Sequence, residues 1–209
     1  TMILLLASCC GGWHVYRYVK TENFQQEMIA LNNLHVNEPK MEIDTCQIDV
    51  VQQKEQLKFR AHIFGKPIKE SSTFTFTLNP GLEVKAITMD GQTLSHRREA
   101  HLLWIEFPEI ITEEESVQFT IEYEGVVDER ICYLDIPEEL LIEQEKFMGS
   151  FNIGKRYAYQ TKEYTLLTPE SYWYPRTGVC YSDESPDCQQ SYFANFQMSV
   201  TPNERLTVI

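Results

Sequence analysis

Three segments between residues 41 and 127 alternate apolar with polar side chains, and this alternation constrains the fold more than any other feature. The segments cover residues 57–63, 73–78 and 117–124. Because successive side chains of a strand point to opposite faces, a period of two predicts strands with one buried face. Turn-forming residues separate them: Gly65-Lys66-Pro67, Asn79-Pro80-Gly81 and Asp90-Gly91-Gln92. Strands at such spacing predict a mainly β fold, an antiparallel β-sandwich or saddle-like sheet domain.

The composition argues against nucleic acid as a partner and is compatible with one large folded domain. The chain has 209 residues, 43% of them hydrophobic, and a formal net charge of −13. A chain of this length can bury a sizeable core. Phosphate binding needs clustered Lys and Arg, whereas the basic groups at residues 66–69 and 97–98 are small. We therefore predict no nucleic-acid binding.

The N-terminal residues 2–10 are almost wholly apolar, and aromatic residues follow at Trp13, Tyr16 and Tyr18. A spanning helix needs ~20 apolar residues, so this run suffices only for the end of one, with the aromatics at headgroup level. A lipoprotein-type anchor, in which residues 6–9 lead to a lipidated cysteine, is a second interpretation. A helix buried in the domain core is a third. We expect residues 1–20 to be the end of a transmembrane helix or a membrane anchor.

The remaining chain divides into a helix and one β domain. Residues 21–40 predict a helical stalk, because Phe24, Met28 and Leu31 share one helical face and Pro39 follows. Residues 41–209 contain no linker and predict a single domain. Within it, residues 135–138 are typical of a helix start, and the period of two returns over residues 192–200. We expect the chain to be a piece of a longer protein, truncated at its C-terminus.

Cysteines form two groups outside the apolar N-terminal run. Cys46 and Cys132 fall in or near strand patterns and are predicted to be buried thiols. Cys180 and Cys188 bracket a polar loop. In an oxidising compartment we predict a disulfide between these two; the alternative is a pair of reduced thiols.

Two groups of residues invite a metal-binding interpretation that their pattern does not favour. His96 and His101 flank a charged segment in a predicted hairpin tip, where solvated histidines are far commoner than ligands. The three consecutive glutamates at 113–115 are more typical of a solvated turn than of a calcium site. Calcium-binding loops alternate their acidic residues through Gly-containing turns, and this run does not.

Several motifs resemble the N-terminal β domain of aminopeptidase N-type zinc metallopeptidases. The first is Leu78-Asn79-Pro80-Gly81-Leu82-Glu83-Val84 leading into Asp90-Gly91, and the second is the strand at 119–125. Tyr172-Trp173-Tyr174-Pro175 stands where that family has an aromatic-Pro pair followed by Asp-Glu-Pro, and residues 192–208 resemble the next strand pair. The Asp-Glu-Pro is missing, and residues 178–190 resemble an insertion.

The resemblance covers residues 41–209 and implies a β domain that shapes one side of a peptide-binding cleft. Tyr172, Trp173 and Tyr174 are the possible cleft wall, although Trp173 has the character of a core residue. The family's His-Glu-x-x-His and Gly-x-Met-Glu-Asn motifs are absent from this sequence. We therefore predict no catalytic, cofactor-binding or metal-ligating residue in this segment. Zinc is expected only in a missing downstream domain.

Together with the apolar N-terminus, the resemblance implies a bacterial membrane protein in which an ABC-2-type permease is fused to an aminopeptidase-like part. The β domain is then extracytoplasmic, in the periplasm, and non-catalytic. Its partners are a peptide substrate or a protein bound through the full-length molecule, and the membrane through the N-terminal segment. The alternatives are a stand-alone envelope β-sandwich binding module or lipoprotein, and a catalytically dead scaffold attached to the permease.

Overall fold

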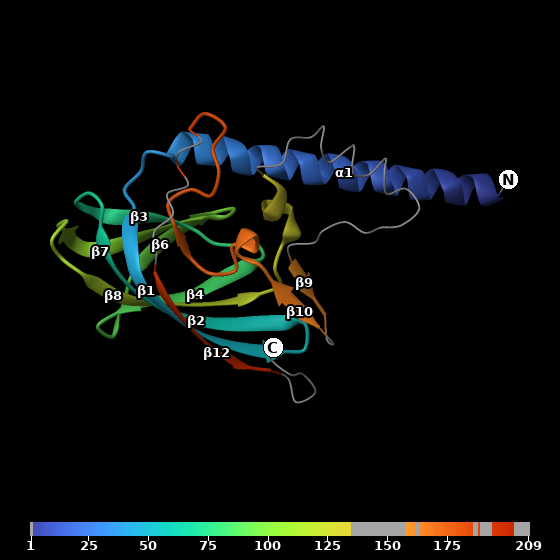
Figure 1. The fold of residues 1–209 in the computed structure, drawn as a ribbon. Helices are drawn as coiled ribbons and strands as arrows, with labels where there is room; N and C mark the ends of the chain where they lie inside the picture. The colour runs from blue at the N-terminus through green and yellow to red at the C-terminus, as the bar shows by residue number, and fades with distance from the viewer. Residues whose placement is uncertain (1, 135–157, 162–163, 186–187, 189–193, 203–209) are drawn as a thin grey trace.

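The computed structural model describes residues 2–134, 158–161, 164–185, 188 and 194–202. One long helix lies along a β domain (Figure 1). This helix is α1 (Met2–His35), and the 3₁₀ helices are η1 (Glu129–Tyr133) and η2 (Pro169–Ser171). The strands are β1 (Met41–Gln53), β2 (Gln56–Pro67), β3 (Ser71–Thr77), β4 (Leu82–Met89), β5 (Gln92–Thr93), β6 (Ser95–Glu99), β7 (Leu102–Ile111), β8 (Val117–Gly125), β9 (Ala158–Gln160), β10 (Thr165–Leu167), β11 (Arg176–Thr177) and β12 (Asn195–Thr201). The predicted helix start at 135–138 lies outside the described residues.

Two main sheets form the domain. The larger has the order β12-β1-β2-β8-β4-β5, and the smaller β11-β3-β7-β6; β9 and β10 form a separate ribbon. Neighbouring strands are antiparallel except β1 and β12, which run parallel. The predicted mainly β fold with antiparallel sheets is confirmed.

Aromatic rings pack between the two sheets. Phe76 of β3 and Phe107 of β7 both lie edge-on to Phe119 of β8, with ring centroids 5.8 and 5.5 Å away. The alternation seen in the sequence explains this packing, because Leu57, Phe59, Ala61 and Ile63 of β2 are all buried while Lys58 and Arg60 are exposed. The strands predicted at 57–63, 73–78 and 117–124 correspond to β2, β3 and β8.

One of the three predicted turns is wrong. The chain reverses at Asn79-Pro80-Gly81 and at Asp90-Gly91, but β2 continues through Gly65 to Pro67. A Cβ atom on Gly65 would lie 2.5 Å from the Glu42 carbonyl oxygen, where the register of β1 and β2 shifts. Gly65 therefore permits a close approach of two strands at a bulge instead of a reversal.

Helix α1 is continuous across the segments predicted as anchor and stalk, and it ends at His35, before Pro39. Its predicted apolar face packs on the β domain. Met28 is fully buried against a cluster formed by Ile131, Cys132, Leu134 and Cys180, and Leu31 packs beside Leu102 and Trp104. The C-terminal part of the helix thus packs on the β domain, and the division into an anchor at 1–20 and a stalk at 21–40 stays a prediction.

The described residues include no helix that combines the length and the apolar content needed to cross a membrane.

A buried polar chain fixes the end of α1. Asn32 and His101 are both fully buried, and the His101 Nε2 lies 2.7 Å from the Asn32 Oδ1. The Asn32 amide in turn donates to the Cys180 Sγ at 3.4 Å. Burial, together with the nearby Arg98 charge, lowers the pKa of His101 to about 3. The expectation of a solvated loop histidine is therefore wrong for His101, whereas His96 is exposed on β6.

The carboxylate of Glu38 joins the helix end to the smaller sheet. It accepts hydrogen bonds from the Trp104 Nε1 and from the Thr75 Oγ1 at 2.8 Å, and it pairs with the His35 Nδ1 at 2.6 Å. Burial alone would raise the pKa of Glu38, but these hydrogen bonds outweigh it and lower that pKa. Glu38 is therefore held in its charged form by three elements at once.

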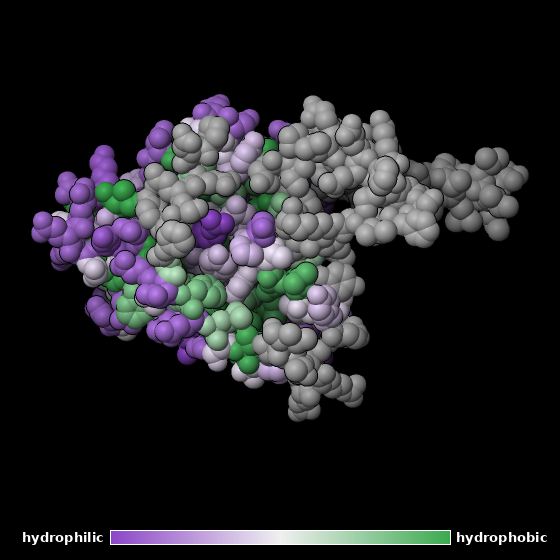
Figure 2. All heavy atoms as spheres, in the orientation of Figure 1, coloured by the Kyte–Doolittle hydropathy of each residue, from purple (hydrophilic) through white to green (hydrophobic). Residues whose placement is uncertain are grey.

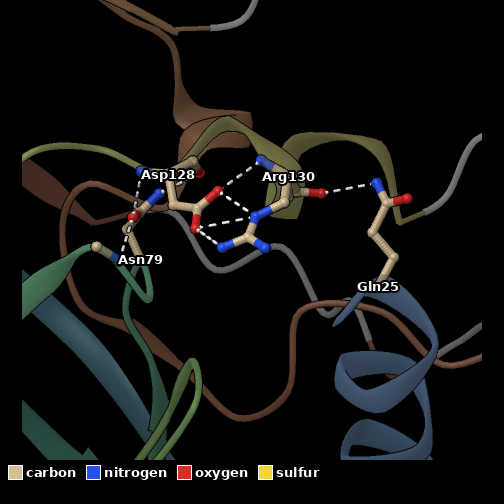
Figure 3. A network of polar contacts seen from close by, with 5 residues as sticks. Gln25, Asn79, Asp128 and Arg130 are labelled. Atoms are coloured by element: carbon tan, nitrogen blue, oxygen red, sulfur yellow. Dashed lines mark hydrogen bonds and ion pairs between the residues drawn. The ribbon is translucent and has the colours of Figure 1, made fainter. Parts of the chain in front are cut away.

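Asn79 lies at the centre of a second polar network, which reaches from the core to α1 (Figure 3). Its amide nitrogen donates to the carbonyls of Asp128 at 3.0 Å and Ser171 at 2.7 Å, and its Oδ1 accepts from the backbone N–H of Gly81 and of Asp128, both at 2.8 Å. A Cβ atom on Gly81 would lie 2.0 Å from the Val126 carbonyl oxygen, so only glycine fits beside this network.

The network continues from Asp128 to the helix. Asp128 caps η1 by accepting from the Arg130 backbone N–H at 3.0 Å, and its carboxylate also binds the Arg130 guanidinium. The Arg130 carbonyl then accepts a hydrogen bond from the Gln25 amide of α1 at 3.0 Å. The Arg130 guanidinium also lies over the Phe24 ring, 3.9 Å from its centroid. Helix and core are therefore linked by contiguous contacts.

Arg98 ties the same turn to the smaller sheet. Its guanidinium donates to the carbonyls of Leu78 at 3.2 Å, Asn79 at 2.5 Å, Leu82 and Ala100 at 3.1 Å. Burial lowers the pKa of Arg98 to about 10, so the side chain remains charged at neutral pH. Backbone carbonyls thus solvate this cation and join the β3–β4 turn to the β6–β7 turn.

We predict that His101 makes the fold sensitive to mild acid. Its folded pKa of about 3 lies below the ordinary 6.5, so the unfolded chain binds a proton first as the pH falls. Its contribution to stability is complete above pH 6.5 and is lost as the pH falls from 6.5 toward 3. The free energy of unfolding should drop by about 1.4 kcal/mol for each pH unit inside this window.

Urea unfolding at pH 7, 6 and 5 tests this. The His101→Gln variant should lose most of the slope between pH 6 and 5, and the exposed-site control His96→Gln should retain it. An unchanged slope in His101→Gln would contradict the assignment.

Candidate functional site

The aromatic segment 172–174 follows η2; Tyr172 lies apart from Trp173 and Tyr174, whose ring centroids are 5.0 Å from each other. Tyr172 has a left-handed backbone, with φ of 49°, and its hydroxyl donates to the Cys180 carbonyl at 3.3 Å. Trp173 is 7% exposed and belongs to the main core, with its ring 5.8 Å from Phe59. Tyr174 turns toward β12. The structure thus brings Trp173 and Tyr174 together and places Tyr172 elsewhere, and the joint role of the three as a cleft wall stays a prediction.

Tyr174, Phe196 and Met198 form the surface that we call the β12 face. Phe196 lies 5.2 Å from Tyr174, centroid to centroid, and 6.0 Å from Trp173, so Trp173 supports it from beneath. The side chains of Phe196 and Met198 are 43% and 53% exposed. An aromatic residue and a methionine exposed side by side are typical of binding surfaces.

The register of β12 explains why these apolar side chains are exposed. Phe196 pairs with Cys46 of β1, and Met198 pairs with Ile48, both of which are buried. Because paired residues share a face of the sheet, Phe196 and Met198 continue the core face of β1 outward. The β12 face is therefore an extension of the core that lacks full cover.

The surrounding surface has the same character. Figure 2 shows hydrophobic residues on the face of the molecule that carries β12 and β10, and Tyr164 and Leu166 at β10 are 53% and 38% exposed. The remaining residues of β12 are uncharged: Asn195, Gln197, Ser199 and Thr201 are polar, and Val200 packs against the core. Burial raises the pKa of Tyr174, so its phenol stays neutral. Such a face suits apolar side chains and peptide groups better than ions.

The backbone of β12 adds a second binding feature. β12 is the last strand of the larger sheet, and within the part of the chain that the structure describes no strand pairs with its outer side. A strand edge presents N–H and C=O groups that an extended peptide or a partner strand can pair with. Edge and β12 face together provide both hydrogen bonds and apolar contacts.

Two grooves elsewhere on the described surface offer fewer binding features than the β12 face. A groove of about 410 Å³ lies at the β7–β8 hairpin, lined by Met89, Phe107, Pro108, Glu109, Ile110, Ile111, Glu115, Ser116 and Val117. A groove of about 360 Å³ lies between α1 and η1, lined by Tyr16, Val19, Lys20, Asn23, Phe24, Glu27 and Arg130. Neither combines a sheet edge with exposed aromatic side chains.

Within the described part of the chain, the buried thiols and His101 do not form a reactive centre. Burial raises the pKa values of Cys46, Cys132 and Cys180 to about 12, so these thiols stay protonated and weakly nucleophilic at neutral pH. Burial likewise keeps His101 neutral. Across the described ranges, no group of three or more His, Cys, Asp or Glu side chains is placed to hold a metal ion. The described residues therefore do not fit a zinc site.

Of the other predicted site residues, only Cys46 adjoins the β12 face, because it pairs with Phe196. Cys46 and Cys132 are buried, as predicted. Cys180 is buried beneath α1, while Cys188 packs at the edge of the Leu102–Trp104 cluster; a disulfide between them stays a prediction. Glu115 lies in the β7–β8 turn, where it accepts hydrogen bonds from the Thr112 N–H and hydroxyl.

Phe196 and Met198 were not singled out from the sequence, although the period of two over 192–200 contained them. Alternation alone shows that they share a face. It does not show that the strand lies at the edge of the larger sheet, where these two side chains stay exposed. The parallel pairing with β1 supplies that information, and no local pattern encodes it.

Among known proteins, this chain is similar to solved structures alone. No family model matches the sequence, and no curated protein matches it. Solved structures do match by fold. An M1 zinc metallopeptidase from Deinococcus radiodurans has a TM-score of 0.53 and 13% sequence identity, covering 78% of this chain and 33% of that chain.

Two further structures are similar to the same extent. A mutant M1 zinc metallopeptidase from Deinococcus radiodurans, bound to a Tyr-Ser-Ala substrate, has a TM-score of 0.52 and 14% identity over 78% of this chain and 32% of that chain. A mutant two-domain M1 zinc metallopeptidase bound to L-arginine has a TM-score of 0.54 and 14% identity over 78% and 33%. At these identities the likeness is one of fold. This chain spans about a third of the length of those enzymes, and its fold resembles part of an M1 zinc metallopeptidase.

Proposed function

We propose that this chain is the non-catalytic β domain of a longer, aminopeptidase-like protein of the zinc metallopeptidase type. The proposal is supported by the fold likeness, which relates this chain to about a third of an M1 metallopeptidase. Two-thirds of such an enzyme has no counterpart here, which leaves room for a separate catalytic part.

The observation that carries the proposal is the uncovered β12 face. A folded domain rarely leaves core-facing aromatic and methionine side chains exposed unless they contact something. In the proposed protein, the β12 face and the adjacent strand edge shape one side of a peptide-binding cleft that another part of the protein completes. Extended peptides are bound by strand edges of this kind.

The zinc ion of the neighbouring enzymes has no place in the described part of this chain. Zinc catalysis needs three protein ligands and an open position for water, and the described side chains offer no such group. In the proposed protein, zinc belongs to the part that this chain does not include. The purified chain with added zinc should not hydrolyse aminoacyl chromogenic substrates.

We expect short apolar peptides to bind weakly at the β12 face. In a titration followed by ¹H–¹⁵N NMR, the backbone amides of β12 and the indole N–H of Trp173 should shift. The Phe196→Ser/Met198→Ser variant should lose these shifts, because it removes the apolar contacts. A matched control, Ile110→Ser, removes an apolar side chain that is 65% exposed on the β7–β8 hairpin and should change nothing.

Shifts confined to the β7–β8 hairpin, or equal binding by the double variant, would contradict the proposed face. Turnover of an aminoacyl substrate that a chelator abolishes would contradict the non-catalytic role.

The apolar N-terminus supports a proposal about location. We propose that residues 2–10 of α1 hold the domain at a bacterial cell membrane, with the β domain on the periplasmic side, as in fusions to an ABC-2-type permease. The support is the apolar sequence itself, which lies in the N-terminal part of α1 that extends away from the strands (Figure 1).

A topology reporter tests the location. Alkaline phosphatase, which is active only outside the cytoplasm, is fused after Ile209 of the proposed longer protein, with any sequence before residue 1 retained, and expressed in a bacterium. The fusion should be active and should sediment with membranes, whereas the Leu4→Lys/Leu5→Lys control should be released, because charged side chains are costly in hydrocarbon. An inactive, cytoplasmic fusion would contradict the proposal.

A further inference from the structure

Helix α1 has two parts with different relations to the β domain. Residues 24–35, which we call the docked segment, contact the domain along roughly three turns, or about 18 Å of helix. Residues 2–23 continue the same helix for about 33 Å more, and Figure 1 shows this part extending beyond the strands.

The docked segment is fixed at both of its ends and in its middle. At its start, Phe24 lies under the Arg130 guanidinium and Gln25 donates to the Arg130 carbonyl at 3.0 Å. In its middle, Met28 is fully buried. These contacts involve different elements of the domain from those at the other end, so rotation about any one of them is opposed by the rest.

At its end, two consecutive residues, Asn32 and Asn33, make three polar contacts that complete the attachment. Asn32 binds His101 at 2.7 Å, the Asn33 amide donates to the Asp183 carboxylate at 2.6 Å, and the Asn33 Oδ1 accepts from the Ser182 hydroxyl at 2.8 Å. The helix direction is thus set by the β domain, and a straight helix carries that direction outward.

The sequence of the helix contains one position at which the helix bends easily. Gly11 and Gly12 are adjacent within α1 and lie between the apolar run and Trp13. Glycine inside a helix costs about 1 kcal/mol relative to alanine, because it frees the backbone to leave the helical region. Kinks in long helices concentrate at such positions. The glycine pair also coincides with the end of the apolar sequence.

We propose that α1 is a jointed arm, in which residues 13–35 are held rigidly by the β domain and Gly11-Gly12 is the joint that lets residues 2–10 change direction. The rigid part, residues 13–35, holds the joint at a set distance from the β12 face. The joint lets that apolar segment adapt its angle. This inference depends on the contacts of α1 and stands independently of the proposed peptidase role.

Pulsed electron–electron double resonance on the full chain tests both the rigid attachment of residues 13–35 and the joint at Gly11-Gly12. A nitroxide is attached through an encoded azido-amino acid at Lys58, which is exposed on central strand β2, and a second one at Val19 or at Ser8. The native cysteines then remain in place. The Val19–Lys58 pair should give a single narrow distance distribution. The Ser8–Lys58 pair should give a wider one, because the joint lies between the labels.

Two variants sharpen the measurement. Gly11→Ala/Gly12→Ala should narrow the Ser8–Lys58 distribution to the width of the Val19–Lys58 pair, since alanine restores the helical preference. Ala30→Gly places a glycine at an exposed position of the docked segment and should leave the Val19–Lys58 distribution narrow, because Phe24, Gln25 and Met28 still hold the helix. Circular dichroism confirms that each variant is folded.

A Ser8–Lys58 distribution that is already narrow with both glycines present would overturn the joint. A wide Val19–Lys58 distribution, or one that widens in Ala30→Gly, would overturn the rigid attachment.

Discussion

The side-chain amide of Asn79 is the interaction on which the arrangement of this chain depends. All four of its hydrogen-bonding positions are used inside the domain, by groups from residues 81, 128 and 171. The backbone of the same residue donates to the Tyr172 carbonyl at 2.8 Å and accepts from Arg98. These partners are partly or fully buried polar groups, and a buried polar group left without a partner costs about 1–3 kcal/mol. One turn therefore holds together segments that are far apart in sequence.

The functional features follow from this centre. Asp128 leads through η1 and Arg130 to the docked segment of α1, so the helix takes its direction from the core (Figure 3). In the other direction, Ser171 precedes the aromatic segment that places Trp173 beneath Phe196. The helix is thus linked to Asn79 through Asp128 on one branch of the network, and the β12 face is linked to it through Ser171 on the other. In the proposed function, the first branch positions the domain and the second presents a binding surface.

The sequence predicts the strands well and the site poorly, for a physical reason. Alternation at 57–63 and 117–124 reports burial of one face, which is a local property, and the same applies to the helical spacing of Phe24, Met28 and Leu31. The network around Asn79 joins residues separated by 49 and 92 positions, and no local pattern encodes such partners. Gly65 was assigned to a turn for the same reason, because its need for a close approach comes from the distant Glu42. His101 was placed in solvent because its cover comes from α1.

Denaturation of Asn79→Ala tests the central claim, that Asn79 unites the helix, η1 and the aromatic segment with the β core. Urea unfolding is followed by far-ultraviolet circular dichroism, and the exposed-site control is Asn195→Ala on β12. We predict that Asn79→Ala lowers the free energy of unfolding by about 3–5 kcal/mol, because it leaves several buried backbone groups without partners. The control should change it by less than about 0.5 kcal/mol. Equal stability of the two variants would contradict the account.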